Sequence, residues 1–260
     1  MNIVVLAKYV PDATAPRGFR DDDMTVDRDG VPGLLSELDE HPIEEALKLA
    51  ESQGAEVTVL TVGPADAAEA VKKALQLGVD KGVHVLDDAV HGSDAVGTSL
   101  VLAKALDRIG AYDLVLTGMA STDGVTSVVP AMLAERLGLP QVTFAAELTV
   151  ADGTVTVRRD GEVASRTVEA SLPAVVSVTD QANEPRYPSF KGIMAAKKKP
   201  VETWSLADLG VDPGDVGLDA AWTEVLSVEP LPPRGKGTIV ADEGDGGSQL
   251  VAFLAEKKFV

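Results

Sequence analysis

Cysteine is absent from this chain of 260 residues, and the only histidines are His41, His84 and His91. Without cysteine the chain can form no disulfide, no thiolate nucleophile and no cysteine-ligated zinc or iron–sulfur centre. The three histidines are far apart in the sequence and have no carboxylate at a ligand-like spacing, so we expect no metal site. Long apolar runs are also missing, since no stretch reaches the about 18 residues that a membrane-spanning helix needs. We therefore expect no membrane insertion.

Basic residues are scarce, with 23 Lys and Arg against 41 Asp and Glu and a formal charge of −18. Such a negative field repels nucleic acid and anionic membrane surfaces, so neither is an expected partner. The chain opens directly into the strand-like run Ile3–Ala7, without a basic region or a small-residue cleavage site. We therefore expect no export signal and a cytoplasmic location.

Strand-like runs alternate with helical patterns over the first two thirds of the chain. The expected strands are residues 3–7, 56–62, 81–86, 113–117 and 173–178, and the expected helices are 40–53, 65–77, 93–109 (capped by Ser93) and 125–137. This alternation predicts the α/β class with a doubly wound parallel sheet. Ligands of such sheets bind beyond the carboxyl ends of strands, which directs attention to the residues after Ala7, Val62 and Thr117.

The pattern changes after Pro140. Residues 141–150, 154–159 and 166–170 are expected to be short strands, with a hairpin turn at Ala151-Asp152-Gly153. Beyond Val178 the alternation stops, and only residues 249–259 again have a helical pattern. We predict a domain over residues 1–182, with this hairpin region, and an extension over 183–260. An extension with so little core of its own packs back on its domain or embraces a partner, and composition favours neither.

The loop after the fourth strand, residues 118–130, suits an anion. It leads into a helix N-terminus, where backbone N–H groups are unpaired and the helix dipole favours negative charge. Thr126 and Ser127 offer hydroxyl donors, while Gly118 and Gly124 allow close approach of the backbone. Asp123 is poorly placed to meet phosphate, and could instead cap the helix or hold a ribose hydroxyl. The loop is neither a Walker A motif nor a Gly-x-Gly-x-x-Gly fingerprint, and many similar loops bind nothing.

A specific motif lies further along the chain, at residues 183–199. It reads Asn-Glu-Pro-Arg-Tyr, then a short loop, then Ile-Met-Ala-Ala-Lys-Lys-Lys. This segment closely resembles the electron-transfer flavoprotein β subunit, and motifs such as Gly63-Pro64 and Asp208 to Val211 agree in order and spacing. The resemblance implies an adenine-nucleotide α-hydrolase-like (Rossmann-like) fold and a heterodimer with a larger α subunit that holds most of the FAD. It also implies a structural AMP in the β subunit, which a second FAD replaces in a bifurcating subset.

The resemblance also implies a nucleotide site, at the predicted carboxyl ends of the strands. Its residues would be Leu6, Ser36, Leu38, Asp39, Val62, Gly118, Ala120, Ser121, Thr122, Asp123, Gly124, Val125, Thr126, Ser127 and Val128. Two parts depart from the family's pattern. The loop 122–127 has neither the second Asp nor the Gln of its relatives. Leu38 stands where relatives have an aromatic residue, which reduces the packing expected near the flavin.

Residues 188–199 match the segment that the family uses to recognise acyl-CoA dehydrogenases. The docking residues would be Tyr187, Phe190, Ile193, Met194 and Lys197, with Phe190 as the apolar anchor. An exposed aromatic residue in a loop is a plausible hot spot, although Phe190 could instead pack inward. The run Lys197–Lys199 is either a solvated charge cluster or a means of steering an acidic partner.

The function implied by the resemblance is that of an electron carrier. Electrons would pass from acyl-CoA dehydrogenases or related flavin dehydrogenases through FAD to a membrane quinone oxidoreductase. The sequence contains no evident proton-transfer dyad or nucleophile–base pair, so we expect no catalytic residues of its own. Two alternatives stay open: a bifurcating flavoprotein subunit that binds a second FAD, and a stand-alone nucleotide-binding protein.

Overall fold

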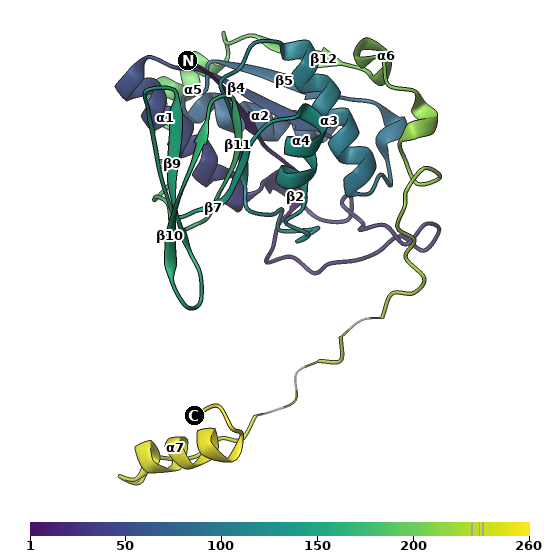
Figure 1. Ribbon diagram of the computed structural model, residues 1–260. Coiled ribbons are helices and arrows are strands. Elements are labelled where there is room, and N and C mark those ends of the chain that lie inside the picture. Colours follow the sequence, from purple (N-terminus) through teal and green to yellow (C-terminus); the bar gives the residue numbers. More distant parts are fainter. Residues whose placement is uncertain (230, 234, 236) are drawn as a thin grey trace. The chain divides into compact units, whose positions relative to one another are not determined.

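A parallel sheet of seven strands is the framework of the first part of the chain (Figure 1). The computed structural model describes residues 1–229, 231–233, 235 and 237–260. In spatial order the strands are β12 (Val201–Trp204), β5 (Lys81–Val85), β4 (Glu56–Val62), β1 (Asn2–Leu6), β6 (Leu114–Gly118), β11 (Ala174–Val178) and β7 (Gln141–Ala145). Every neighbouring pair is parallel. The predicted α/β fold with a parallel sheet is thereby confirmed.

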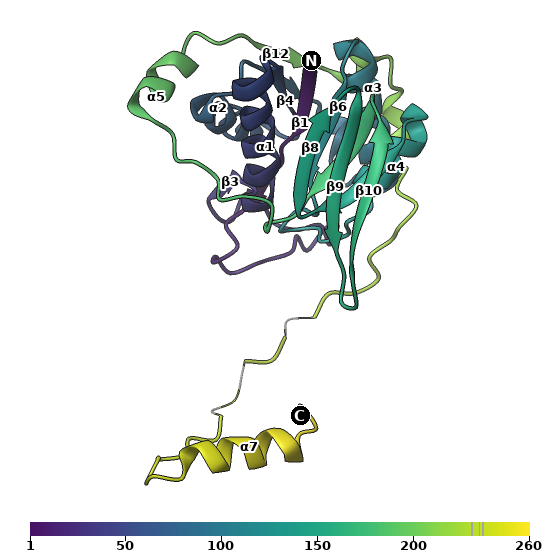
Figure 2. The same ribbon diagram turned by 60° about the vertical axis from the view of Figure 1, so that its left-hand side comes forward.

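Helices cover both faces of the sheet (Figure 2), which explains why β6 and β11 are apolar and buried along their whole length. Side chains of β1 alternate between the two faces: Ile3 and Val5 belong to one core cluster, Val4 and Leu6 to the other. The first cluster contains α1 (Glu37–Gln53) and α2 (Ala68–Leu77). The second contains α3 (Ala95–Ile109) and α4 (Val129–Leu137).

A separate antiparallel sheet consists of β8 (Glu147–Ala151), β9 (Thr154–Asp160) and β10 (Ser165–Ser171). The hairpin turn between β8 and β9 is as expected, with positive φ at Asp152 and Gly153. The expectation of a single strand over 141–150 is wrong, because β7 and β8 belong to different sheets. The extended conformation is interrupted near Phe144, whose φ of 60° lies in the left-handed region. Apolar residues continue at every second position through this interruption, so the sequence pattern does not reveal it.

Two helices begin later than the sequence pattern indicates. Helix α3 begins at Ala95, and the side chain of Asp94, not of Ser93, caps it by accepting from the amides of Val96 and Gly97. Helix α4 begins at Val129 and not at 125, because φ is positive at Val125 and Ser127, which excludes helical geometry there.

The chain after Val178 contains more regular structure than expected. Helix α5 (Phe190–Ala196) packs against α2, and β12 extends the main sheet beside β5. Trp204, at the end of β12, and Leu206 and Leu209 of α6 (Leu206–Leu209) are buried in the core cluster of α3. The four residues of β12 are too few to show a period, so only the neighbouring strand reveals this element. The remaining short elements are the antiparallel pair β2 (Tyr9–Pro11) and β3 (Gly33–Leu35) and the 3-10 turns Ala65–Ala67, Asp88–Val90 and Pro213–Asp215.

The chain divides into two units, Met1–Leu226 and Ser227–Val260. The boundary expected at residue 182 lies inside the first unit. The second unit contains α7 (Gly246–Glu256), which overlaps the helix expected over 249–259. No helix within the described residues combines the length and the apolar character needed to cross a membrane.

Candidate functional site

A cavity of about 570 Å³ lies at the carboxyl ends of β4, β1 and β6. Leu6, Val62 and Gly118, at or next to the ends of these three strands, line it. Strands β4 and β5 follow one another on one side of β1, and strands β6 and β11 follow one another on its other side. The cavity thus lies at the point where the topology reverses, which is where open α/β sheets bind ligands.

Most of the predicted nucleotide-site residues line this cavity. Those that do are Leu6, Asp39, Val62, Gly118, Ala120, Ser121, Gly124, Thr126, Ser127 and Val128. Those outside its lining are Ser36, Leu38, Thr122, Asp123 and Val125. Ser36 is fully buried, and its Oγ has no hydrogen-bond partner among the described residues. These placements bring the predicted residues together, while binding itself stays a prediction.

Asp123 forms ion pairs at the edge of the cavity. Its side chain is only 2% exposed; Oδ1 lies 2.9 Å from Lys8 Nζ and Oδ2 lies 2.7 Å from Arg28 Nη2. Burial opposes ionisation of this carboxyl, but Lys8 and the hydrogen bonds from Ser121 and Arg28 outweigh burial and hold its pKa below the usual range. Asp123 therefore does not cap α4, and its carboxylate is paired with two cations.

Asp39, in the first turn of α1, is a second buried carboxyl at the same cavity. Its Oδ2 accepts a hydrogen bond of 2.8 Å from the Lys8 backbone amide. Burial raises the pKa of Asp39 to about 7, and the donors around it only partly offset that effect. Gly118 must be glycine here, because a Cβ at that position would lie 2.5 Å from Asp39 Oδ1 and 2.9 Å from the Leu38 carbonyl oxygen.

Two helices begin at the cavity, and they differ in capping. Asp94 caps α3, and its Oδ2 also accepts from the Trp222 amide at 2.8 Å. At α4 the N-cap is Val128, and no side chain of the described residues caps the helix. The first backbone donors of α4 are therefore free of a capping side chain beside the cavity.

Sequence reasoning missed several polar residues that line this cavity, among them Lys8, Arg28, Asp94 and Thr223. Lys8 follows the first strand closely, so the rule that ligands bind after strand ends could have found it. Arg28 and Thr223 lie in parts of the chain without a strand or helix signal, so only the folded chain brings them to the cavity.

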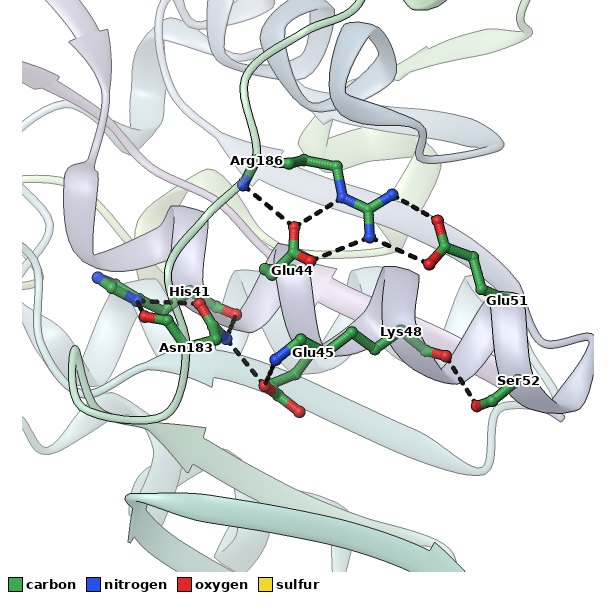
Figure 3. Close-up of polar contacts among 8 residues, drawn as sticks. All are labelled: His41, Glu44, Glu45, Lys48, Glu51, Ser52, Asn183 and Arg186. Atoms are coloured by element: carbon green, nitrogen blue, oxygen red, sulfur yellow. Dashed lines mark hydrogen bonds and ion pairs between the residues drawn. The ribbon is translucent and has the colours of Figure 1, made fainter.

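The start of the recognition segment, which we define as residues 183–199, is fixed to α1 (Figure 3). Arg186 donates from Nε to Glu44 Oε2 at 2.7 Å and from Nη2 to Glu44 Oε1 at 3.0 Å, and it also pairs with Glu51. Asn183 Nδ2 donates to Glu45 Oε1 at 2.9 Å and to the His41 carbonyl oxygen at 2.9 Å. Glu44 and Glu45 are buried, so this attachment is an ordered part of the fold.

The predicted docking side chains are exposed beyond this attachment. Tyr187 is 92% and Phe190 is 82% exposed, so Phe190 does not pack inward. Ile193 and Met194 on α5 and Lys197, which directly follows it, are also exposed. Gly192 allows α5 to approach α2 closely, because a Cβ there would lie 2.4 Å from the Gln76 carbonyl oxygen.

Lys199 differs from the other two lysines of its run. Its Nζ donates to the carbonyl oxygens of Leu75, Gly78 and Val79 at 3.1, 2.8 and 2.6 Å, at the C-terminus of α2. Burial lowers the pKa of Lys199. This lysine satisfies helix-end carbonyls, whereas Lys197 and Lys198 are exposed.

Known proteins are similar to this chain along its whole length. The sequence profile described as electron transfer flavoprotein domain matches residues 23–209. The electron transfer flavoprotein subunit beta of Mycobacterium leprae (strain TN) is 48% identical, and that of Mycobacterium tuberculosis (strain ATCC 25618 / H37Rv) is 47% identical; each match covers 100% of this chain and 99% of the relative. The caffeyl-CoA reductase-Etf complex subunit CarD of Acetobacterium woodii is 34% identical, with 100% of both chains covered.

Fold and cavity define an α/β protein with a cavity at the switch point of a parallel sheet. The profile match and the full-length identities assign it more closely: the chain belongs to the family of electron transfer flavoprotein β subunits.

Proposed function

We propose that this β subunit forms a heterodimer with an electron transfer flavoprotein α subunit and carries electrons from dehydrogenases, such as acyl-CoA dehydrogenases, to a membrane quinone oxidoreductase. FAD, held mostly by the α subunit, supplies the redox chemistry when bound, and this chain supplies no catalytic residue. The observation that carries the proposal is the recognition segment. Arg186 attaches this segment to Glu44 of α1, and the aromatic side chains of Tyr187 and Phe190 beyond it are exposed.

The cavity in this subunit is the proposed site of a structural AMP. Leu6, Leu60 and Val62 offer apolar wall for a base, while Lys8 and Arg28 offer cations for a phosphate. The backbone donors at the start of α4 have no capping side chain among the described residues, which suits an anion as well. The chemistry of this donor set thus fits a nucleotide with one charged end.

Docking of the dehydrogenase is proposed to depend on Phe190 as the anchor, with Tyr187, Ile193, Met194 and Lys197 around it. Aromatic side chains that fill a partner's pocket contribute most to interfaces of this kind. The hydrogen bonds of Arg186 and Asn183 to α1 hold the segment in place before the partner arrives, which reduces the entropy lost on docking.

The test is the rate at which an acyl-CoA dehydrogenase reduces the flavin of the purified heterodimer. Phe190→Ala should lower the second-order rate constant by about tenfold or more, the effect of losing a hot spot. Val163→Ala, which truncates a side chain that is 98% exposed between β9 and β10, is the matched control and should leave the rate unchanged. An unchanged rate in Phe190→Ala, with flavin content intact, would show that the anchor assignment is wrong.

A second candidate function is that of a bifurcating flavoprotein subunit with FAD in the same cavity. It is favoured by the 34% identity to a relative whose name places it in a caffeyl-CoA reductase–Etf complex. The two candidates differ in bound cofactor: two flavins per heterodimer for the bifurcating type, and one flavin with one AMP for the carrier.

A further inference from the structure

The cavity has a cationic edge built from residues far apart in the sequence. Lys8 follows β1, and Arg28 belongs to the segment 12–32 between β2 and β3. Both side chains line the cavity, and each donates to a different oxygen of the Asp123 carboxylate. Arg28 uses Nε and Nη2 for Oδ2 at 3.1 and 2.7 Å, while Lys8 Nζ reaches Oδ1 at 2.9 Å.

Two cations share one carboxylate here, so the side chains of Lys8, Arg28 and Asp123 together carry a net charge of about +1 on a chain of formal charge −18. The side chains of Lys8 and Arg28 are 40% and 35% exposed, whereas that of Asp123 is 2% exposed. A guanidinium has five N–H donors and an ammonium three, so both cations keep donors that Asp123 does not use.

The loop that supplies Arg28 is tied to the loop that follows β6. Arg17 Nη2 donates to the Thr122 carbonyl oxygen at 2.7 Å, and Arg28 pairs with the neighbouring Asp123. Gly124 N also donates to Asp123 Oδ1 at 2.7 Å. Both loops are therefore held together at the point where Arg28 meets the cavity. Asp94 also lines the cavity, and its carboxylate accepts from the amides of Val96 and Gly97 at the start of α3.

We propose that Arg28 is a specificity-determining residue of the nucleotide site: it binds the phosphate of the nucleotide, while Asp123 orients Arg28 and Lys8 toward the cavity. This inference rests on the proposed AMP site. Arginine binds phosphate through charge-assisted hydrogen bonds, and the donors left over from Asp123 are available for it. The phosphate end of the ligand lies at the Lys8–Arg28 edge and the nucleoside extends away from it along the apolar wall.

The experiment compares AMP with adenosine, which differs only at the phosphate. The heterodimer, freed of nucleotide, is titrated with each ligand by calorimetry, as wild type and as Arg28→Gln. The substitution should weaken AMP binding by about 10- to 100-fold, the effect of losing a hydrogen bond to a charged group, and leave adenosine affinity unchanged. Arg20→Gln, in the same segment but paired with Asp29 outside the cavity lining, is the matched control.

Each outcome decides between the claims. Wild type that binds no AMP would overturn both the proposed AMP site and the role of Arg28. Wild type that binds AMP as tightly as Arg28→Gln does would overturn the role of Arg28 alone. Equal losses for AMP and adenosine would show that Arg28 shapes the cavity without recognising phosphate, and would also overturn it. Arg28→Lys keeps the charge beside Asp123 and guards against a folding defect; it should bind AMP with an affinity between those of wild type and Arg28→Gln.

Discussion

At the scale of single residues, two carboxyl groups at one cavity have opposite properties. Among the described residues, Asp39 accepts only backbone hydrogen bonds, which do not offset burial, and burial raises its pKa to about 7. The side chain of Asp123 is only 2% exposed but faces Lys8 and Arg28, which help to hold its pKa below the usual range. The difference arises from what surrounds each carboxyl, because burial alone would raise both pKa values.

Asp39 should make stability depend on pH. Its folded pKa of about 7 lies above the usual 3.8, so the folded protein holds this proton more tightly than the unfolded chain. Ionisation of Asp39 therefore costs stability as pH rises from about 4 to about 7. Asp39→Asn should raise the free energy of unfolding at pH 8 by at most about 4 kcal/mol, at about 1.4 kcal/mol per pKa unit, and change it little at pH 4.

Urea unfolding at the two pH values measures this difference. Asp22→Asn, at an exposed position, is the control and should have the same small effect at both. A stabilisation by Asp39→Asn that is equal at pH 4 and pH 8 would contradict the pKa assignment.

Lys199 should contribute to stability, although it belongs to a run of three lysines. Lys199→Met removes the donors to three carbonyl oxygens at the end of α2 and should lower the free energy of unfolding by about 1–3 kcal/mol. Lys198→Met, at the exposed neighbour, should leave it nearly unchanged. Chemical denaturation of both variants makes the comparison, and equal effects would refute the capping role.

Single-residue roles were the hardest part to predict from the sequence. The loop 118–128 and the strand ends identified the cavity, because those rules depend on local pattern. The partners of Asp123 lie 115 and 95 residues away, so no local pattern links Lys8 and Arg28 to it. For the same reason the sequence suggested only a solvated charge or a means of steering an acidic partner for Lys199, and not its contacts at the end of α2.

At the scale of elements, α1 connects the cavity with the recognition segment. Its first turn places Asp39 at the cavity, and the following turns present Glu44, Glu45 and Glu51 to Arg186 and Asn183 (Figure 3). One helix thus positions both the proposed nucleotide site and the proposed docking segment.

Arg186→Lys should loosen the recognition segment while leaving the rest of the fold intact. Lysine cannot reproduce the forked contact with Glu44, so the attachment weakens. Amide hydrogen exchange of α5 should accelerate by about tenfold, equivalent to about 1.4 kcal/mol, while that of α3 stays constant. Arg166→Lys makes the same chemical change at an exposed position of β10 and is the control. Unchanged exchange in α5 would show that Arg186 does not hold the segment.

Elements with strong periodicity were predictable to within a few residues. Strands β1, β4, β5, β6 and β11 and helices α1 to α4 follow their apolar patterns. The errors occurred where backbone conformation changed without a change of pattern, as at Phe144, or where an element was too short to have a period, as in β12. In both cases the packing of the segment against neighbouring strands determined its structure.

At the scale of the whole molecule, the chain consists of a sheet-based unit and a second unit over Ser227–Val260. Helix α7 in the second unit has no buried residue, and Leu250, Val251 and Phe253 are exposed. We propose that this apolar helix is covered by the α subunit. Within the expected extension over 183–260, residues 201–209 belong to the sheet and its core. The prediction that the extension embraces a partner therefore applies chiefly to the second unit.

Binding of the α subunit should protect α7. Hydrogen exchange of residues 246–256 should be rapid in the isolated chain and slow by about tenfold or more in the heterodimer, because burial removes local opening. Amides of β6, which are buried in the first unit, serve as the internal reference. Slow exchange of α7 in the isolated chain would contradict its role as an arm.

The carrier account as a whole depends on what the heterodimer contains. Purification with the α subunit, followed by denaturation and quantification of released FAD and AMP, measures this directly. The account predicts one FAD and one AMP per heterodimer. Two FAD and no AMP would contradict it and establish the bifurcating alternative.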